Sequence, residues 1–416
     1  MAEIIDISDS IRVINLVDPK FKTMRVSISM VVPLSRETAA MNAILASLVS
    51  RATKNYPDYT ELSKYLSGLY GSSLASSVTK IGDNQVITIS VSGISNKYAL
   101  NGEDIERELT ALLCSAVFDP LKDDNGLFPA QGFEQEKRQL LENIDAEFND
   151  KKVYAKNRCT GELFKNEPAG ISRFGTREEV MAIDPEALPK RWDEILKEAN
   201  FEISILGDCN FTGVMDTVKS FMNFGRSPLK LQNVIMPVKD KPEVIEETMK
   251  VAQSKLVMGY RTGNAKGAPV KLMGVIFGGT PSSKLFANVR EKMSLCYYCS
   301  ARAGDTKGVM FVESGVETAK TGEARKAIEE QFDAVKNNDF TDKEIDFARL
   351  AMVNSYKSVG DSLYSLESFY LNQMFDEKVM TPEEKIHELN AVTREDIVKA
   401  AESTCLDTVY VLKGIS

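Results

Sequence analysis

The chain has 416 residues, which is too long for one ordinary hydrophobic core, so we expect two domains of roughly 200 residues each. Its content of 43% hydrophobic and 27% charged residues is typical of a globular protein, and no apolar run approaches the roughly 20 residues of a membrane span. The net charge of −9 and the lack of a basic block argue against nucleic acid and membrane surfaces as partners.

The first half of the chain alternates strand and helix patterns. Polar and apolar residues alternate up to Pro33, apolar residues recur at helical spacing after Thr38, and Asp58 can cap a second helix. A turn at residues 82–84 joins two strand-like runs, which predicts a hairpin. The expected elements are strands within 11–33, helices at 38–54 and from 58, strands at 74–80 and 85–93, helices at 104–117, 133–164 and 185–199, and a strand at 202–206.

Residues 222–245 contain prolines and show no strong periodicity, so we expect an interdomain linker there. It would separate an N-terminal domain at 1–221 from a C-terminal domain at 246–416. The second half then repeats the pattern of the first, which predicts an α+β duplication. The expected elements are a strand at 253–261, helices at 268–277, 318–337, 341–375 and from 381, and a strand at 407–412.

The stretch from Gly278 to Gly308 contains residues of the kinds that form a functional site. A short helix is expected to end near Lys292, and a strand begins directly after it, so the chain can reverse between Arg290 and Tyr297. A fixed positive charge and a phenol brought together can hold a carbonyl or an oxyanion. The alternative is that the arginine only complements the helix dipole and the tyrosine only packs.

The same stretch carries a family resemblance. Residues 283–298 read Ser-Lys-Leu-Phe-x-x-Val-Arg-Glu-Lys-x-x-Leu-x-Tyr-Tyr, which resembles the C-terminal half of the pitrilysin/insulinase family of zinc metallopeptidases. The most similar branch looks like the bacterial relatives of mitochondrial processing peptidase. Residues 133–137, 149–155 and 406–414 resemble that branch as well, so the resemblance covers nearly the whole chain.

The resemblance implies a fold and a role for two residues. The fold would be two homologous αβ-roll domains, each a mostly antiparallel sheet with helices on one face, which together form half of a clamshell. In this family an arginine and a tyrosine seven residues later help hold substrate over a zinc site built by an N-terminal domain. Arg290 and Tyr297 match that pair in type and spacing.

The zinc motif of the family is absent. Active members carry His-x-x-Glu-His on the first helix and a later glutamate. With Ala52 and Thr53 as the anchor, the motif positions fall on residues without zinc-binding side chains. The degenerate positions are Ala43, Ala46, Ser47 and, for the later glutamate, Asn143, with the neighbouring Glu142 as the other register. The chain contains a single histidine, His387, so no two-histidine site can be built and we expect no metal in this chain.

The six cysteines are scattered, which fits reduced thiols in the cytoplasm, and the acidic start of the chain shows no secretory signal. Cys296 and Cys299 have the spacing of a redox or metal clip. Both fall in a predicted strand, where a separation of three places side chains on opposite faces. The spacing is therefore interpreted as coincidence.

Two functional hypotheses follow from the residues and the resemblance. In the first, the chain is inactive alone and is the zinc-free subunit of a heterodimeric metallopeptidase, whose homologous partner supplies His-x-x-Glu-His and the zinc. This chain then contributes Arg290 and Tyr297 to peptide binding and transition-state stabilisation across a shared chamber. In the second, the chain is a stand-alone pseudo-peptidase that pairs with itself and holds peptides as a scaffold or chaperone.

Overall fold

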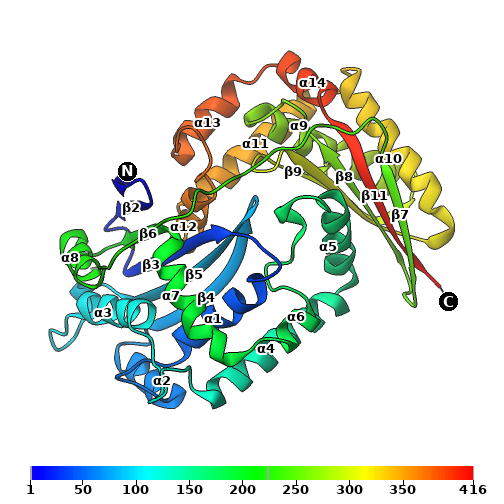
Figure 1. Cartoon of the computed structure of the whole chain (residues 1–416). Helices are drawn as coiled ribbons and strands as arrows, with labels where there is room; N and C mark the ends of the chain where they lie inside the picture. Colours follow the sequence, from blue (N-terminus) through cyan, green and yellow to red (C-terminus); the bar gives the residue numbers. More distant parts are fainter. Residues whose placement is uncertain (1, 223, 416) are drawn as a thin grey trace. The chain divides into compact units, whose positions relative to one another are not determined.

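The computed structural model describes residues 2–222 and 224–415, so that Asn223, inside the predicted linker, lies outside the described residues. The chain divides into two compact units. The first contains residues 1–146, 171–232 and 362–374, and the second contains residues 147–170, 233–361 and 375–416. Compared with a division at residues 222–245, each unit therefore receives one segment from the other half of the chain (Figure 1).

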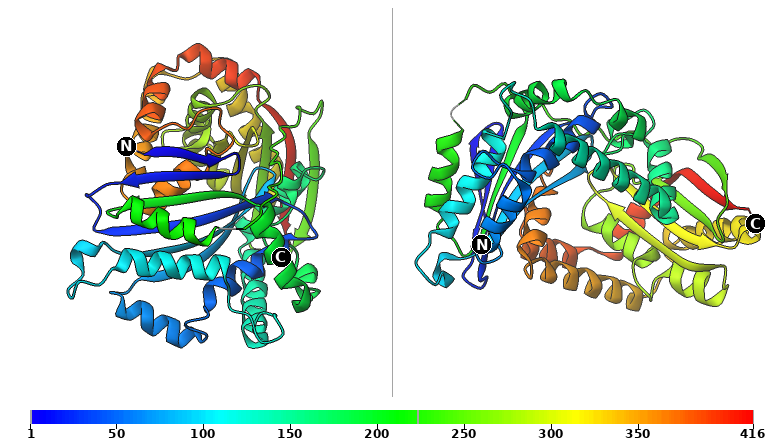
Figure 2. Two further views of the ribbon diagram at one scale, coloured as in Figure 1. Left: turned by 60° about the vertical axis from the view of Figure 1, so that its left-hand side comes forward. Right: turned by 90° about the horizontal axis from the view of Figure 1, so that it is seen from below.

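A six-stranded sheet in the order β1-β2-β6-β3-β5-β4 forms the centre of the first unit. Only the β2–β6 pair is parallel. In the left view of Figure 2 the blue N-terminal strands and the green β6 run side by side. The strands are β1 (Glu3–Ser8), β2 (Ile11–Val17), β3 (Thr23–Pro33), β4 (Ser73–Ile81), β5 (Asn84–Ile94) and β6 (Asn200–Gly207).

Helices cover the apolar face of this sheet. Alternate residues of β3, such as Val26, Ile28 and Met30, are fully buried in one core with α1, α3 and α7. The opposite face contacts α12, where Arg25 of β3 pairs with Glu367 at 2.6 Å. The helices of this unit are α1 (Ala39–Arg51), α2 (Tyr59–Gly68), α3 (Ile105–Phe118), α4 (Ala130–Asn149), α6 (Arg177–Met181), α7 (Leu188–Glu198), α8 (Phe211–Phe221) and α12 (Leu363–Leu371).

The second unit repeats this topology. Its sheet has the order β7-β11-β8-β10-β9, which reproduces β2-β6-β3-β5-β4 strand for strand, and its β7–β11 pair is likewise parallel. The duplication predicted from the sequence is therefore confirmed, with two mostly antiparallel sheets. The strands are β7 (Glu243–Met249), β8 (Ser254–Arg261), β9 (Cys296–Gly304), β10 (Val309–Val316) and β11 (Cys405–Gly414).

The helices of the second unit lie on both faces of its sheet. One face packs on a core shared with α9, α10 and α14, and the other packs on α5 through Cys159, Leu163 and Tyr410. The elements are α5 (Lys151–Leu163), α9 (Ala268–Gly278), the π-helical segment η4 (Leu285–Lys292), α10 (Thr321–Lys336), α11 (Asp342–Val359), α13 (Pro382–Ala391) and α14 (Arg394–Glu402). No helix within the described residues is both long and apolar enough to cross a membrane.

Two predicted helices are wrong in length. The helix expected at 133–164 is interrupted at Asp150, whose side chain accepts hydrogen bonds from the backbone N–H groups of Lys152 and Val153 and so begins a new helix. The helix expected at 341–375 is interrupted in the same way at Ser362. In both cases a capping side chain inside a long periodic run competes with helix continuation. Strand β1 was not predicted, and β7 begins at Glu243 within the predicted linker.

Candidate functional site

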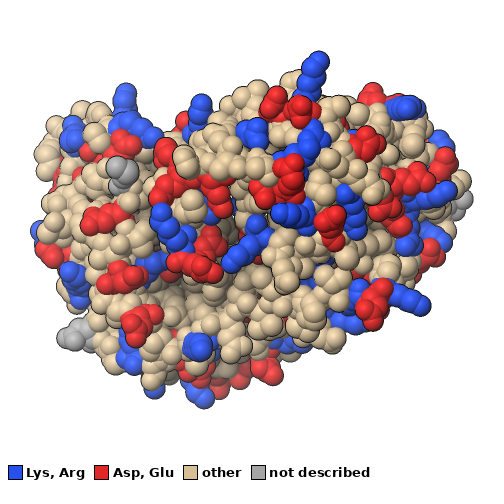
Figure 3. All heavy atoms as spheres, turned by 90° about the horizontal axis from the view of Figure 1, so that it is seen from above, with Lys and Arg blue, Asp and Glu red and all other residues tan. Residues whose placement is uncertain are grey.

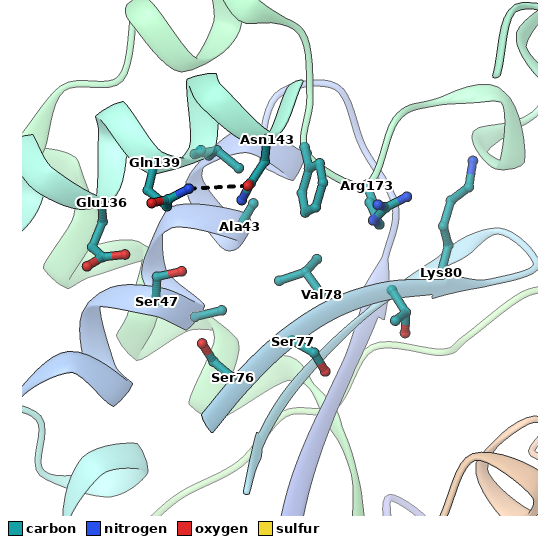
Figure 4. A pocket seen from close by; sticks show the side chains of 14 residues that line it. Ala43, Ser47, Ser76, Ser77, Val78, Lys80, Glu136, Gln139, Asn143 and Arg173 are labelled. Carbon is teal, nitrogen blue, oxygen red and sulfur yellow. Dashed lines mark hydrogen bonds between the residues drawn. The ribbon is translucent and has the colours of Figure 1, made fainter. Parts of the chain in front are cut away.

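The four degenerate zinc positions line one pocket of about 510 Å³ in the first unit. Helix α1, helix α4, strand β4 and the loop before α6 form its walls (Figure 4). The lining residues are Ala43, Ala46, Ser47, Ser76, Ser77, Val78, Thr79, Lys80, Glu136, Gln139, Leu140, Asn143, Arg173 and Phe174. Asn143 is among them and Glu142 is not, although the sequence left both registers open.

Helix α1 presents its degenerate positions to the pocket because its other side is fixed by buried hydrogen bonds. Asn42 donates to Gln85 of β5 at 2.7 Å and accepts from Arg191 of α7 at 2.9 Å. Gln85 in turn donates to the carbonyl of Ala39 at 3.0 Å. These bonds set the rotation of the helix, so that positions three and four residues apart face the same pocket.

Helix α4 forms the opposite wall with polar side chains one turn apart. Glu136 pairs with Arg51 of α1 at 2.7 Å, and Gln139 donates to Asn143 at 3.4 Å. Figure 4 shows Gln139 and Asn143 on the side of α4 that faces Ala43. The wall therefore offers amide groups and a paired carboxylate where an active relative requires a glutamate ligand.

The residues at these positions do not fit a zinc ion. Zinc in proteins takes thiolate, imidazole or carboxylate ligands, and two alanines, a hydroxyl and an amide supply none of them. His387 is exposed on α13 of the second unit. Within residues 2–222 and 224–415 no cluster of three or more His, Cys, Asp and Glu side chains could hold a metal. The four degenerate positions therefore do not supply the zinc ligands on which metal-assisted hydrolysis depends.

Strand β4 gives the pocket an open sheet edge, which the sequence analysis did not predict. Among the described strands it pairs with β5 alone. Ile81 and Asn84 flank a two-residue turn that begins with Gly82 at φ +59°, so they form a hydrogen-bonded pair. Along the ladder, such hydrogen-bonded pairs alternate with pairs whose backbone groups point away from the neighbouring strand. Ser76 and Val78 belong to the second kind, so their backbone N–H and C=O groups point outward. The same two side chains face the pocket.

Arg290 and Tyr297 lie in the second unit, at the junction of η4 and β9. A π-helical hydrogen bond from Met293 N–H to the Asn288 carbonyl (2.9 Å) ends η4, and Ser294 adopts a positive φ of 52°. The Arg290 guanidinium stacks over Phe286 at 4.4 Å from the ring centre, and its side chain is 39% exposed.

Tyr297 is 64% exposed. No hydrogen bond joins it to Arg290 in the part of the chain that the structure describes. Both groups therefore remain available to an outside partner. π-helical turns of this kind are rare and occur frequently at functional sites.

The predicted arrangement of Cys296 and Cys299 is wrong. The register of β9 against β10 shifts at Tyr297, because Cys296 lies opposite Val316 while Tyr298 lies opposite Gly315. This β-bulge adds one residue and turns both cysteines to the same face, where they pack on the core of the second unit. A bulge cannot be recognised from the period of the sequence alone.

Comparison with known proteins identifies the family. Residues 182–352 match the model described as "Peptidase M16 inactive domain". The chain is 32% identical over 400 residues to the probable inactive metalloprotease YmfF of Bacillus subtilis (strain 168), a match that covers 95% of this chain and 94% of that protein.

Solved structures show the same fold. A conserved protein from Enterococcus faecalis V583 superposes with a TM-score of 0.91 at 27% identity, over 100% of this chain and 99% of the other. A peptidase M16 inactive domain from Pseudomonas fluorescens superposes with a TM-score of 0.80 at 14% identity, over 100% and 98% of the two chains. The chain therefore belongs to the M16 (pitrilysin/insulinase) peptidase family, and its degenerate zinc positions lie together in one pocket.

Proposed function

We propose that this chain is the zinc-free subunit of a heterodimeric zinc metallopeptidase. A homologous partner would supply His-x-x-Glu-His and the zinc ion, and this chain would contribute Arg290 and Tyr297 to peptide binding and to the transition state. The observation that carries the proposal is that both side chains are exposed, while the degenerate positions in the pocket of the first unit offer no zinc ligand. A guanidinium and a phenol are suited to hold the peptide carbonyl as negative charge develops on its oxygen.

The local structure supports this role for the pair. Stacking on Phe286 restricts the guanidinium to few rotamers, so less conformational entropy is lost when it binds a carbonyl. Glu291 approaches Arg290 only at 3.6 Å and is itself exposed, so it competes weakly. The charge of the arginine is therefore free to act on a substrate.

The pocket of the first unit supports peptide binding by this chain. A peptide in extended conformation can add to the open edge of β4 through the backbone groups of Ser76 and Val78. Its side chains would then meet the polar wall of α4. The surface in view in Figure 3 mixes acidic and basic side chains over most of its area.

The experiment is a pull-down of the tagged chain from its native extract at a cytoplasmic salt concentration. A stoichiometric partner of similar size that carries His-x-x-Glu-His supports the heterodimeric peptidase. The Arg290→Ala variant should recover the same partner, because the arginine is assigned to substrate rather than to assembly. Recovery of the chain only as a homodimer or with unrelated clients contradicts the proposal.

The second candidate function, a stand-alone peptide scaffold, is favoured specifically by the β4 edge. It predicts that the purified chain binds unstructured peptides without a partner. Val78→Pro would remove one outward backbone donor and should weaken that binding, whereas Ser73→Ala, at an exposed position of the same strand outside the pocket lining, should not. Peptide binding to the isolated chain, followed by fluorescence anisotropy, separates this function from the first.

A further inference from the structure

Cys296 and Cys299 lie side by side on one face of β9. Because of the bulge at Tyr297, Cys296 is opposite Val316 and Cys299 is opposite Ser314. These two partners on β10 are two residues apart, which corresponds to roughly 6.4–6.8 Å along a strand. The two cysteines therefore have about the same separation, which falls at the upper end of the Cα distances of about 4.4–6.8 Å found in disulfides.

The two thiols differ in exposure. Cys299 is only 5% exposed, while Cys296 is half-buried at the start of the strand, next to the exposed Tyr297. A hydrogen bond from the Cys299 thiol, a second from Ser314 and the nearby Arg290 charge lower the pKa of Cys296 to about 7. The same contact with Cys296, together with burial, raises the pKa of Cys299 well above its usual value.

We propose that Cys296 and Cys299 form a peroxide-sensitive dithiol that closes into an intramolecular disulfide across the bulge. Cys296 is the attacking thiolate, because it is the accessible member of the pair and lies beside Arg290. Cys299 is the resolving thiol, because it is buried directly next to it. The site is independent of the peptidase role proposed above and does not require peptide or partner.

The oxidation balances with a hydroperoxide as oxidant. The Cys296 thiolate attacks one peroxide oxygen, the O–O bond breaks, and the leaving hydroxide takes a proton to become water, which leaves a sulfenic acid on Cys296. Cys299 then loses its proton and its sulfur attacks the Cys296 sulfur. The S–O bond breaks, and the second hydroxide leaves with that proton as water. Two thiols are oxidised to one disulfide, and one peroxide is reduced to two waters.

The test is peptide mapping of the full-length folded chain. The protein is treated with hydrogen peroxide, its remaining thiols are blocked with N-ethylmaleimide, and it is digested with trypsin. Cleavage after Lys292 and Arg302 places both cysteines in one peptide. After peroxide treatment we expect this peptide to carry no maleimide and to be lighter by two hydrogen atoms than its reduced form. If dithiothreitol is added before the blocking step, the peptide should again carry two maleimides. A peptide that still carries two maleimides after peroxide treatment overturns the proposal.

Single variants assign the two roles. Cys299→Ser should stop at a sulfenic acid on Cys296 that dimedone traps, whereas Cys296→Ser should leave Cys299 reduced. Cys405→Ser, which removes a half-buried thiol outside the pair, is the matched control and should oxidise like the wild type. Oxidation of Cys299 at an unchanged rate in Cys296→Ser, or a disulfide between two chains on a non-reducing gel, would contradict the assignment.

Discussion

At the scale of single residues, Arg290 is assigned to substrate in the proposed function and also influences a neighbouring thiol. Its positive charge is among the causes that lower the pKa of Cys296, after the hydrogen bonds from Cys299 and Ser314. An ordinary cysteine thiol has a pKa near 8.5. The thiolate of Cys296 should therefore be abundant at neutral pH, where most thiols are protonated.

The first prediction concerns this ionisation. The rate of Cys296 alkylation by iodoacetamide should rise with pH and reach half its maximum near pH 7, because the thiolate is the reacting species. Arg290→Ala should shift this midpoint upward, and Arg325→Ala, a surface arginine of α10 that pairs with Glu329, should not. Quantitative mass spectrometry of the labelled peptide gives the profile, and a midpoint near 8.5 in the wild type would refute the prediction.

The second prediction restores the lost zinc ligands. Because Ala43, Ser47 and Asn143 line the same pocket, the triple variant Ala43→His, Ser47→His and Asn143→Glu should bind one zinc ion per chain. The double histidine variant that keeps Asn143 is the control and should bind at least about tenfold more weakly. The measurement is the zinc content of each variant after gel filtration. A triple variant that contains no zinc would show that the three positions do not converge on a ligand geometry.

The loss of the zinc ligands could be predicted from the sequence, whereas the arrangement of the two cysteines could not. A missing histidine is visible in a single chain, so the loss of the zinc site could be predicted from Ala43 and Ser47 alone. The proximity of Cys296 and Cys299 could not, since one inserted residue reverses the side chain alternation on which the prediction depends.

At the scale of elements, α5 depends on its cap and on a buried ionic network. Arg261 of β8 contacts Glu167, after the end of α5, at 2.6 Å and Asp407 of β11 at 3.0 Å, and all three side chains are almost fully buried. Lys307 pairs with Glu167 at 2.8 Å as well. This network connects the segment that follows α5 to two strands of the second unit.

The third prediction is that Glu167→Gln lowers the free energy of unfolding by about 3 kcal/mol, because it leaves the buried guanidinium of Arg261 without one of its counter-charges. Glu162→Gln, which removes only a 3.8 Å pair at a partly exposed position of α5, should cost less than about 0.5 kcal/mol. Equilibrium urea unfolding of both variants gives the comparison. Equal stability of the two would show that the network contributes no net stability.

The fourth prediction concerns the helix break at Asp150. Asp150→Ala should cost about 1 kcal/mol, since two backbone N–H groups at the start of α5 lose their acceptor. Asp150→Ser can accept the same hydrogen bonds and should retain most of the stability. An Asp150→Ala protein as stable as the wild type would indicate that α4 and α5 can join into the single helix that periodicity predicts.

Element types were easier to predict than element lengths. The types of β3, α1 and β8 could be predicted because their apolar residues recur at the spacing of a strand or a helix and pack into the cores. The interruption between α4 and α5 depends on one aspartate in a run that is otherwise helical. The order of strands and the exchange of α5 and α12 between the units depend on contacts between distant residues, which local patterns do not encode.

At the scale of the whole molecule, the duplication explains how a peptidase fold can remain after its chemistry is lost. Both units keep the same strand order, so the scaffold that positions η4 and β9 does not require the zinc ligands of the first unit. The family relationship to YmfF agrees with a non-catalytic chain. In the function proposed above, the Arg290–Tyr297 segment is the part of the fold through which this chain would contribute to catalysis.

The most direct test of the account is peptide turnover by a reconstituted pair. The chain is mixed with the purified homologue that carries His-x-x-Glu-His, and cleavage of a quenched-fluorescence peptide is measured. We expect no turnover by this chain alone, turnover by the zinc-loaded mixture, and a loss of about 100-fold in kcat with Arg290→Ala at unchanged assembly. Wild-type turnover by the mixture containing Arg290→Ala, or by the partner without this chain, would contradict the account.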